Sequence, residues 1–170
     1  MSLREVIQTM YDEGVKDELV VMQLTEQHFG GTTSKATKFE DTQRHIDFWW
    51  YDANGKGYGI DVKGVKKNNR SDRFADTSIH WVELQNVRGN VGWVYGDAVY
   101  IAFIVDKSVL FVPRKKLAAF VENKIAGKST VGINPRECYI PYQRAGRLDK
   151  IVKVPTSDLI SLAKHILPKP

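Results

Sequence analysis

Three segments of the chain alternate apolar with polar residues, and this period of two restricts each segment to a β-strand. The segments are residues 45–51, 58–65 and 79–87. Successive side chains of a strand point to opposite faces of its sheet, so each segment has an apolar face and a face of polar and aromatic residues. The pattern predicts a sheet that lies on a hydrophobic core and carries its functional side chains on the other face.

Apolar residues at helical spacing over residues 3–28 predict one helix, or two helices divided at Gly14, with Gly30-Gly31 as the stop. Residues 31–43 are polar and predict a loop, in which Glu40-Asp41 is suited to open a short turn. Two further helices are expected nearer the C-terminus, at 114–125 and 155–166.

A nearly continuous apolar run at 98–105 is typical of a central strand that is buried on both faces. Two shorter strands are expected after it, at 109–112 and 138–142. The order of helix, strands, helix, strand and helix predicts an α/β fold with a mixed sheet flanked by helices.

Length and composition fit one domain. The 170 residues suffice to bury a hydrophobic core without disulfides or structural metal ions. The one cysteine, Cys138, cannot form an internal disulfide. No signal peptide precedes the first helix, and no apolar run approaches the roughly 20 residues that span a bilayer. We therefore expect a single cytoplasmic domain over residues 1–170, with no membrane partner.

Basic residues are clustered although the charge excess is modest, with a formal net charge of +5 and a pI of about 9.2. One group includes Lys63, Lys66, Lys67, Arg70 and Arg73, and a second includes Arg114, Lys115 and Lys116. Such clusters attract phosphate backbones through charge and counterion release, although a solvated surface has the same composition. DNA is the predicted partner. Four basic residues are expected to guide its phosphate backbone, namely Lys66, Lys67, Arg70 and Arg73.

The turn between the first two strands decides where two aspartates lie. A two-residue loop at 54–55 would place Asp47 and Asp61 on opposite faces. A three-residue loop at 53–55, with Gly55 left-handed, pairs Asp47 directly with Asp61. The second register is predicted because it leaves one apolar face, formed by Ile46, Phe48 and Trp50 with Ile60 and Val62.

Two carboxylates that face each other across a strand pair repel, and a cation between them removes the repulsion. Mg²⁺ binds such a pair and fills its other positions with water or substrate phosphate. Lys63, on the same face as Asp61, is suited to stabilise charge on a phosphate or to orient the attacking water. On the third strand, Glu83 is expected to add a carboxylate to the ion, and Gln85 to hold a water or a phosphate oxygen.

Asp47, a hairpin turn and Asp61-Val62-Lys63 together resemble the PD-(D/E)XK nuclease superfamily. This superfamily includes restriction endonucleases, Holliday-junction resolvases and many phage-encoded nucleases. The resemblance, over roughly residues 40–105, implies a restriction-endonuclease-like fold and DNA hydrolysis that depends on Mg²⁺ or Mn²⁺. It further implies that Asp47 and Asp61 are metal ligands and that Lys63 is the catalytic lysine.

Two positions depart from the pattern of the superfamily. Ile46 stands in place of its proline, and four residues compete for its acidic position on the first helix: Glu13, Asp17, Glu18 and Glu26. Two more residues have open roles. Asp41 either joins the site or caps a turn. His45 either supports the site residues or contacts the substrate, or else it is a solvent-facing strand residue.

Two other functions compete with the nuclease. A non-catalytic DNA-binding module explains the basic patch but gives no reason for Asp47, Asp61, Lys63 and Glu83 to share one face. A hydrolase of a small phosphorylated substrate would be expected to carry a glycine-rich phosphate cradle, which the sequence lacks. By analogy, a homodimer is expected, because cutting two strands favours two sites.

Overall fold

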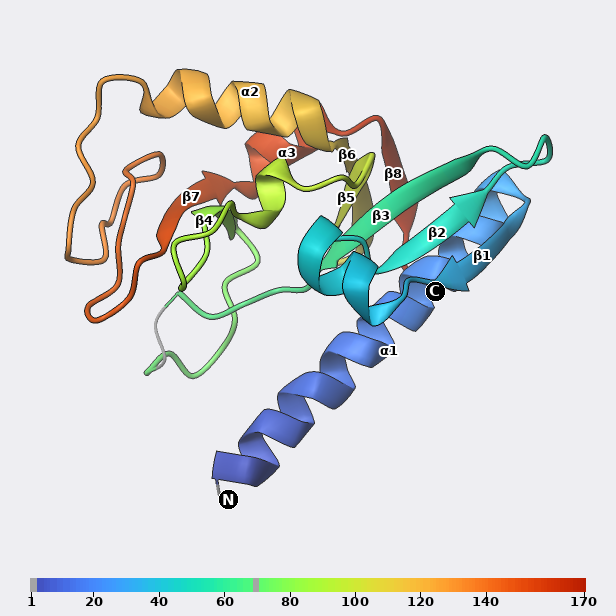
Figure 1. Ribbon diagram of the computed structural model, residues 1–170, viewed down its shortest axis with the longest axis horizontal. Helices are drawn as coiled ribbons and strands as arrows, with labels where there is room; N and C mark the ends of the chain where they lie inside the picture. The colour runs from blue at the N-terminus through green and yellow to red at the C-terminus, as the bar shows by residue number, and fades with distance from the viewer. Residues whose placement is uncertain (1–2, 69–70) are drawn as a thin grey trace.

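The computed structural model describes residues 3–68 and 71–170, and within them the chain forms a mixed α/β fold (Figure 1). A six-stranded sheet has the order β1-β2-β3-β5-β6-β8, and β4 and β7 form a separate two-stranded sheet. The strands of the large sheet are β1 (Thr32–Lys35), β2 (Phe48–Tyr51), β3 (Gly57–Lys63), β5 (Tyr100–Ile104), β6 (Ser108–Pro113) and β8 (His165–Pro168). The small sheet contains β4 (Ile79–Gln85) and β7 (Lys150–Pro155).

The large sheet is mostly antiparallel, and its one parallel pairing joins β3 to β5. The predicted mixed sheet is therefore confirmed. β5 lies between β3 and β6, and its side chains alternate between two hydrophobic clusters on opposite faces of the sheet. This double burial explains the continuous apolar run that predicted a central strand.

Helices cover both faces of the large sheet. On one face, Val21 and Leu24 of α1 (Leu3–Phe29) pack with Phe48 and Ile60. The other cluster joins the sheet to the small sheet, to α2 (Arg114–Ile125) and to α3 (Thr156–Leu162). No helix in the described part of the chain is long and apolar enough to cross a membrane.

The first helix is continuous, so a break at Gly14 is not observed. It ends at Phe29, and Gly30 and Gly31 follow with φ angles of +70° and +74°, which confirms the predicted stop. It contacts β1, β2 and β3, and the ring of Phe29 at its end also packs against Phe111 of β6 and His165 of β8. Its N-terminal half projects away from the sheet (Figure 1).

The hairpin between β2 and β3 has the predicted register. Phe48 pairs with Ile60, the N–H of Asp52 donates to the carbonyl of Lys56 at 3.0 Å, and Gly55 is left-handed at φ +78°. The N–H of Asp47 donates to Ile60 at 2.9 Å and continues the ladder one residue before β2. Asp47 therefore lies opposite Asp61 as expected.

The predicted start of the first strand, at residue 45, is wrong. His45 is left-handed, at φ +54°, so the strand begins at Phe48 instead of residue 45. The side chain of Ile46 lies over Gly59, in the cluster on the opposite face from Phe48. The backbone turn at His45 thus removes Ile46 from the predicted apolar face.

Other differences lie in regions where pairing partners are distant in sequence. Within the predicted loop 31–43, β1 pairs with β2, and a π-helical turn, η1 (Glu40–Arg44), precedes His45. The predicted strand 138–142 is absent because Tyr139 is left-handed, at φ +61°, and only isolated bridges form there. The last helix ends at Leu162 instead of residue 166, because His165–Pro168 pairs with the open edge of β6 as β8.

Candidate active site

Asp61 is a carboxylate buried near the end of β3. It is 1% exposed, and its Oδ1 accepts a hydrogen bond from Lys63 Nζ at 2.5 Å. Its Oδ2 is buried and has no hydrogen-bond partner among the described residues. Opposite it, Asp47 Oδ2 accepts the backbone N–H of Val62 at 2.6 Å. The two aspartates thus meet at one point of the sheet, where Asp61 Oδ2 receives no hydrogen bond from a donor group of the described residues and the two carboxyl groups are close enough to share a proton.

Burial raises the pKa of Asp61 to about 8; Lys63 opposes this rise and Asp47 adds to it. Burial by itself disfavours the Lys63 ammonium, but attraction to Asp61 and Asp47 outweighs it, so the pKa of Lys63 is raised. Lys63 Nζ also lies 4.9 Å from the centroid of the Trp93 ring. Lys63 is therefore held as a cation beside a carboxyl group that readily keeps a proton.

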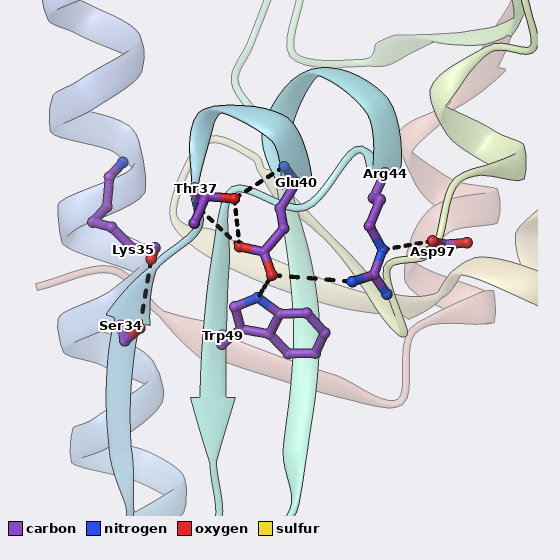
Figure 2. A network of polar contacts seen from close by, with 7 residues as sticks. All are labelled: Ser34, Lys35, Thr37, Glu40, Arg44, Trp49 and Asp97. Atoms are coloured by element: carbon purple, nitrogen blue, oxygen red, sulfur yellow. Dashed lines mark hydrogen bonds and ion pairs between the residues drawn. The ribbon is translucent and has the colours of Figure 1, made fainter.

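The π-helical turn η1 is held by Glu40 (Figure 2). The Glu40 carboxylate accepts hydrogen bonds from the N–H of Thr37 at 2.8 Å and from Trp49 Nε1 at 3.1 Å. Arg44, at the end of the turn, donates from Nε to Asp97 at 2.7 Å. These contacts tie the turn to β2 and to the segment before β5.

The same turn carries Asp41 toward the two aspartates. Burial raises the pKa of Asp41, repulsion from Asp47 raises it further, and attraction to Lys63 and His45 opposes the change. Asp41 therefore lies within electrostatic reach of the site. The His45 side chain packs against Gly96 at the turn that redirects the chain, so the structure does not place it on a strand.

One acidic residue of α1 lies next to the site. A Cβ atom built on Gly64 would lie 2.6 Å from Asp17 Oδ2, so the Asp17 carboxylate covers the residue that follows Lys63. Burial raises the pKa of Asp17. Of the other three candidates, Glu18 pairs with Lys35, Glu26 accepts the N–H of Thr33, and Glu13 is exposed. Gly64 is the sequence signal that marks this close approach.

The third predicted strand does not continue the sheet of Asp61. β4 pairs with β7, so the expected alignment of its polar face with β3 is wrong. Glu83 is nevertheless close enough to Lys63 to raise the pKa of the lysine. Gln85 donates from Nε2 to the carbonyl of Leu148 at 2.6 Å and holds a loop instead of facing the aspartates.

The basic residues after β3 have different surroundings. Lys66 borders a small cavity together with Lys63, and both Lys66 and Lys67 are exposed to solvent. Arg73 is exposed and its guanidinium lies 5.2 Å from the ring centroid of the exposed Phe74. Arg70 lies outside the described residues.

The donor set fits a divalent metal ion on two carboxylates. Asp61 Oδ2 is a buried oxygen without a partner, and Asp47 lies directly across the hairpin. Mg²⁺ is commonly held by one or two carboxylates, with water and substrate phosphate as further ligands. No preformed group of three or more His, Cys, Asp or Glu side chains able to hold a metal occurs within residues 3–68 and 71–170. The expected third ligand, Glu83, is therefore not part of a preformed cluster.

A scan of the sequence against models of protein families gives no match. Searches of curated proteins and of solved structures also give no match.

Proposed function

We propose that the protein is a metal-dependent nuclease of the PD-(D/E)XK type, with a restriction-endonuclease-like fold. The observation that carries this proposal is the buried, unpartnered Oδ2 of Asp61 beside Lys63 and opposite Asp47. A buried carboxylate oxygen that receives no hydrogen bond is costly to folding. Such a cost is typical of a site that is built for a ligand or for chemistry.

Asp47 and Asp61 would hold Mg²⁺ or Mn²⁺, which when bound lowers the pKa of its water and polarises the phosphorus centre. The hydrogen bond from Val62 fixes the carboxylate of Asp47. Lys63, held between Asp61 and Trp93, presents a positive charge that stabilises charge developing on the phosphate. Asp41, Asp17 and Glu83 add negative charge around this centre.

DNA is the proposed substrate because basic residues follow β3 directly. Lys66, Lys67 and Arg73 contact the phosphate backbone in this proposal, and Arg70 belongs to the same run of sequence. Cutting both strands of a duplex favours a homodimer. The lone cysteine, Cys138, suits the reducing cytoplasm of a bacterial or phage-infected cell.

Cleavage of linear, circular and branched DNA in the presence of Mg²⁺ or Mn²⁺ tests the proposal. Asp61→Ala and Lys63→Ala are each expected to lower the cleavage rate by about 10²–10⁴-fold while folding and DNA binding persist. Glu122→Ala is the matched control, because Glu122-Asn123-Lys124 is a second acid-x-lysine triplet, on α2. Its cleavage rate should equal that of the wild type.

The same assay separates the nuclease from a non-catalytic DNA-binding module. A module would bind DNA with the expected salt dependence but would cut none of the substrates with either metal. That result for the wild type would refute the proposed activity.

A further inference from the structure

Two phenylalanine rings are open to solvent on segments that border the proposed site. All seven phenylalanines lie in the described part of the chain, and Phe39 and Phe74 are 66% and 73% exposed. The others are buried or half-buried and pack in one of the two core clusters. Because Phe39 and Phe74 belong to neither cluster, folding does not account for their rings.

Phe39 lies on a segment whose two ends are tied to the backbone around Asp47. Before Phe39, the N–H of Ala36 donates to the carbonyl of Asp47 at 3.0 Å. After Phe39, the carbonyl of Glu40 accepts the N–H of Ile46 at 3.2 Å. The backbone of Phe39 is therefore held beside the strand that carries Asp47, while its side chain points into solvent.

Phe74 lies on the loop that joins β3 to β4, which begins directly after Lys63. Lys63 and Ile79, on either side of this loop, border one cavity of about 20 Å³, so the two ends of the loop lie close together. Within the loop, Asn68 Nδ2 donates to Asp76 Oδ2 at 2.9 Å. This hydrogen bond joins a residue before Phe74 to a residue after it, so the loop is closed and Phe74 projects from it.

A cation accompanies each exposed ring. Lys38 precedes Phe39, Arg73 precedes Phe74, and both basic residues are exposed. The Arg73 guanidinium lies 5.2 Å from the centroid of the Phe74 ring. An open ring with a cation beside it suits a single nucleotide, because the ring stacks on the base and the cation attracts the phosphate. Bases inside a duplex already stack on their neighbours, so such a ring favours bases that are unpaired.

We propose that Phe39 and Phe74 are stacking positions for unpaired bases, so that the substrate is DNA with a single-stranded or branched segment at the cleaved linkage. This inference rests on the proposed nuclease function and names its substrate class. Phe39 holds a base on the side of the site formed by Asp47, and Phe74 holds one on the side of Lys63. The phosphates between them then pass across the proposed metal ligands.

The test measures DNA binding by fluorescence anisotropy in the presence of a chelator, so that no DNA is cut. One labelled DNA is a blunt duplex, and the other is the same duplex with a single-stranded extension. The wild type should bind the extended DNA more tightly. Phe39→Leu and Phe74→Leu keep an apolar side chain but remove the ring. Each should weaken binding to the extended DNA by about 5- to 100-fold and leave binding to the blunt duplex unchanged.

Ile166→Ala is the matched control, because Ile166 is an exposed apolar residue, 50% exposed, on the edge strand β8. It should bind both DNAs as the wild type does. Phe39→Trp and Phe74→Trp restore an aromatic ring and should keep the preference for the extended DNA. If the leucine variants keep the wild-type preference, or lose affinity equally for both DNAs, the stacking role is refuted.

Cleavage after addition of Mn²⁺ is a separate readout that tests the nuclease itself. A wild type that prefers the extended DNA through its phenylalanines but cuts neither DNA refutes the nuclease and leaves the stacking positions standing. A wild type that cuts both DNAs equally well, with the leucine variants unchanged, refutes the proposed substrate class and leaves the nuclease standing.

Discussion

Two aspartates of one hairpin have contrasting surroundings. At the tip, Asp52 Oδ1 accepts the N–H groups of Asn54 at 2.9 Å and Lys56 at 3.0 Å, so its charge stabilises the turn. At the base, Asp61 is buried and its Oδ2 has no partner among the residues described. The same side chain thus serves the fold at one end of the hairpin and costs it stability at the other. The contrast agrees with the proposed role of Asp61 in ligand binding, whereas Asp52 stabilises the turn.

The largest expected effect is on the pH dependence of stability. An aspartate ionises near 3.9 in the unfolded chain, whereas the pKa of Asp61 in the fold is about 8. The folded state therefore binds more protons between these values, and the contribution of Asp61 to stability falls as pH rises through this window. Between about pH 5 and about pH 9, the metal-free wild type should lose roughly 2–4 kcal/mol of unfolding free energy relative to Asp61→Asn.

Urea unfolding in the presence of a chelator measures this difference. The asparagine side chain of the variant keeps the shape of the neutral carboxyl group without its ionisation, so the two unfolding curves should diverge as pH rises. Parallel curves over the whole range would mean that Asp61 ionises in the fold without penalty, and the contrast with Asp52 would lose its basis.

A smaller effect is expected at the tip. Asp52→Ala removes the acceptor of two backbone N–H groups and should lower the unfolding free energy by about 1 kcal/mol. Because the tip is distant along the strands from Asp61, DNA cleavage and metal binding should not change. Thermal unfolding and the cleavage assay, applied to the same variant, check both statements. A large loss of DNA cleavage in Asp52→Ala would contradict the claim that Asp52 serves only the turn.

The sequence predicted those features that local chemistry determines. The left-handed Gly55 in a three-residue loop set the strand register, and that register brought Asp47 opposite Asp61. The apolar stripe of the first helix and its glycine stop were equally local signals. Where backbone geometry follows from neighbouring residues, the prediction was therefore accurate.

The remaining features depend on contacts that are distant in sequence. β4 pairs with β7, about seventy positions further along the chain, and this pairing removes Gln85 from the site. The β-branched residues Ile151, Val152 and Val154 are the local signal for β7. No local pattern indicated that Trp93 would lie beside Lys63, or that left-handed His45 would turn η1 and Asp41 toward the aspartates.

Titration of Mn²⁺ into the DNA-free protein, followed calorimetrically, tests the central claim most directly. The wild type and Asp52→Asn should bind the ion with the same affinity, whereas Asp61→Asn and Asp47→Asn should lose at least about tenfold in affinity. Proton release on binding by the wild type at neutral pH should accompany the loss of the Asp61 proton. Equal Mn²⁺ affinity in all four proteins would contradict the assignment of Asp47 and Asp61 as the metal site.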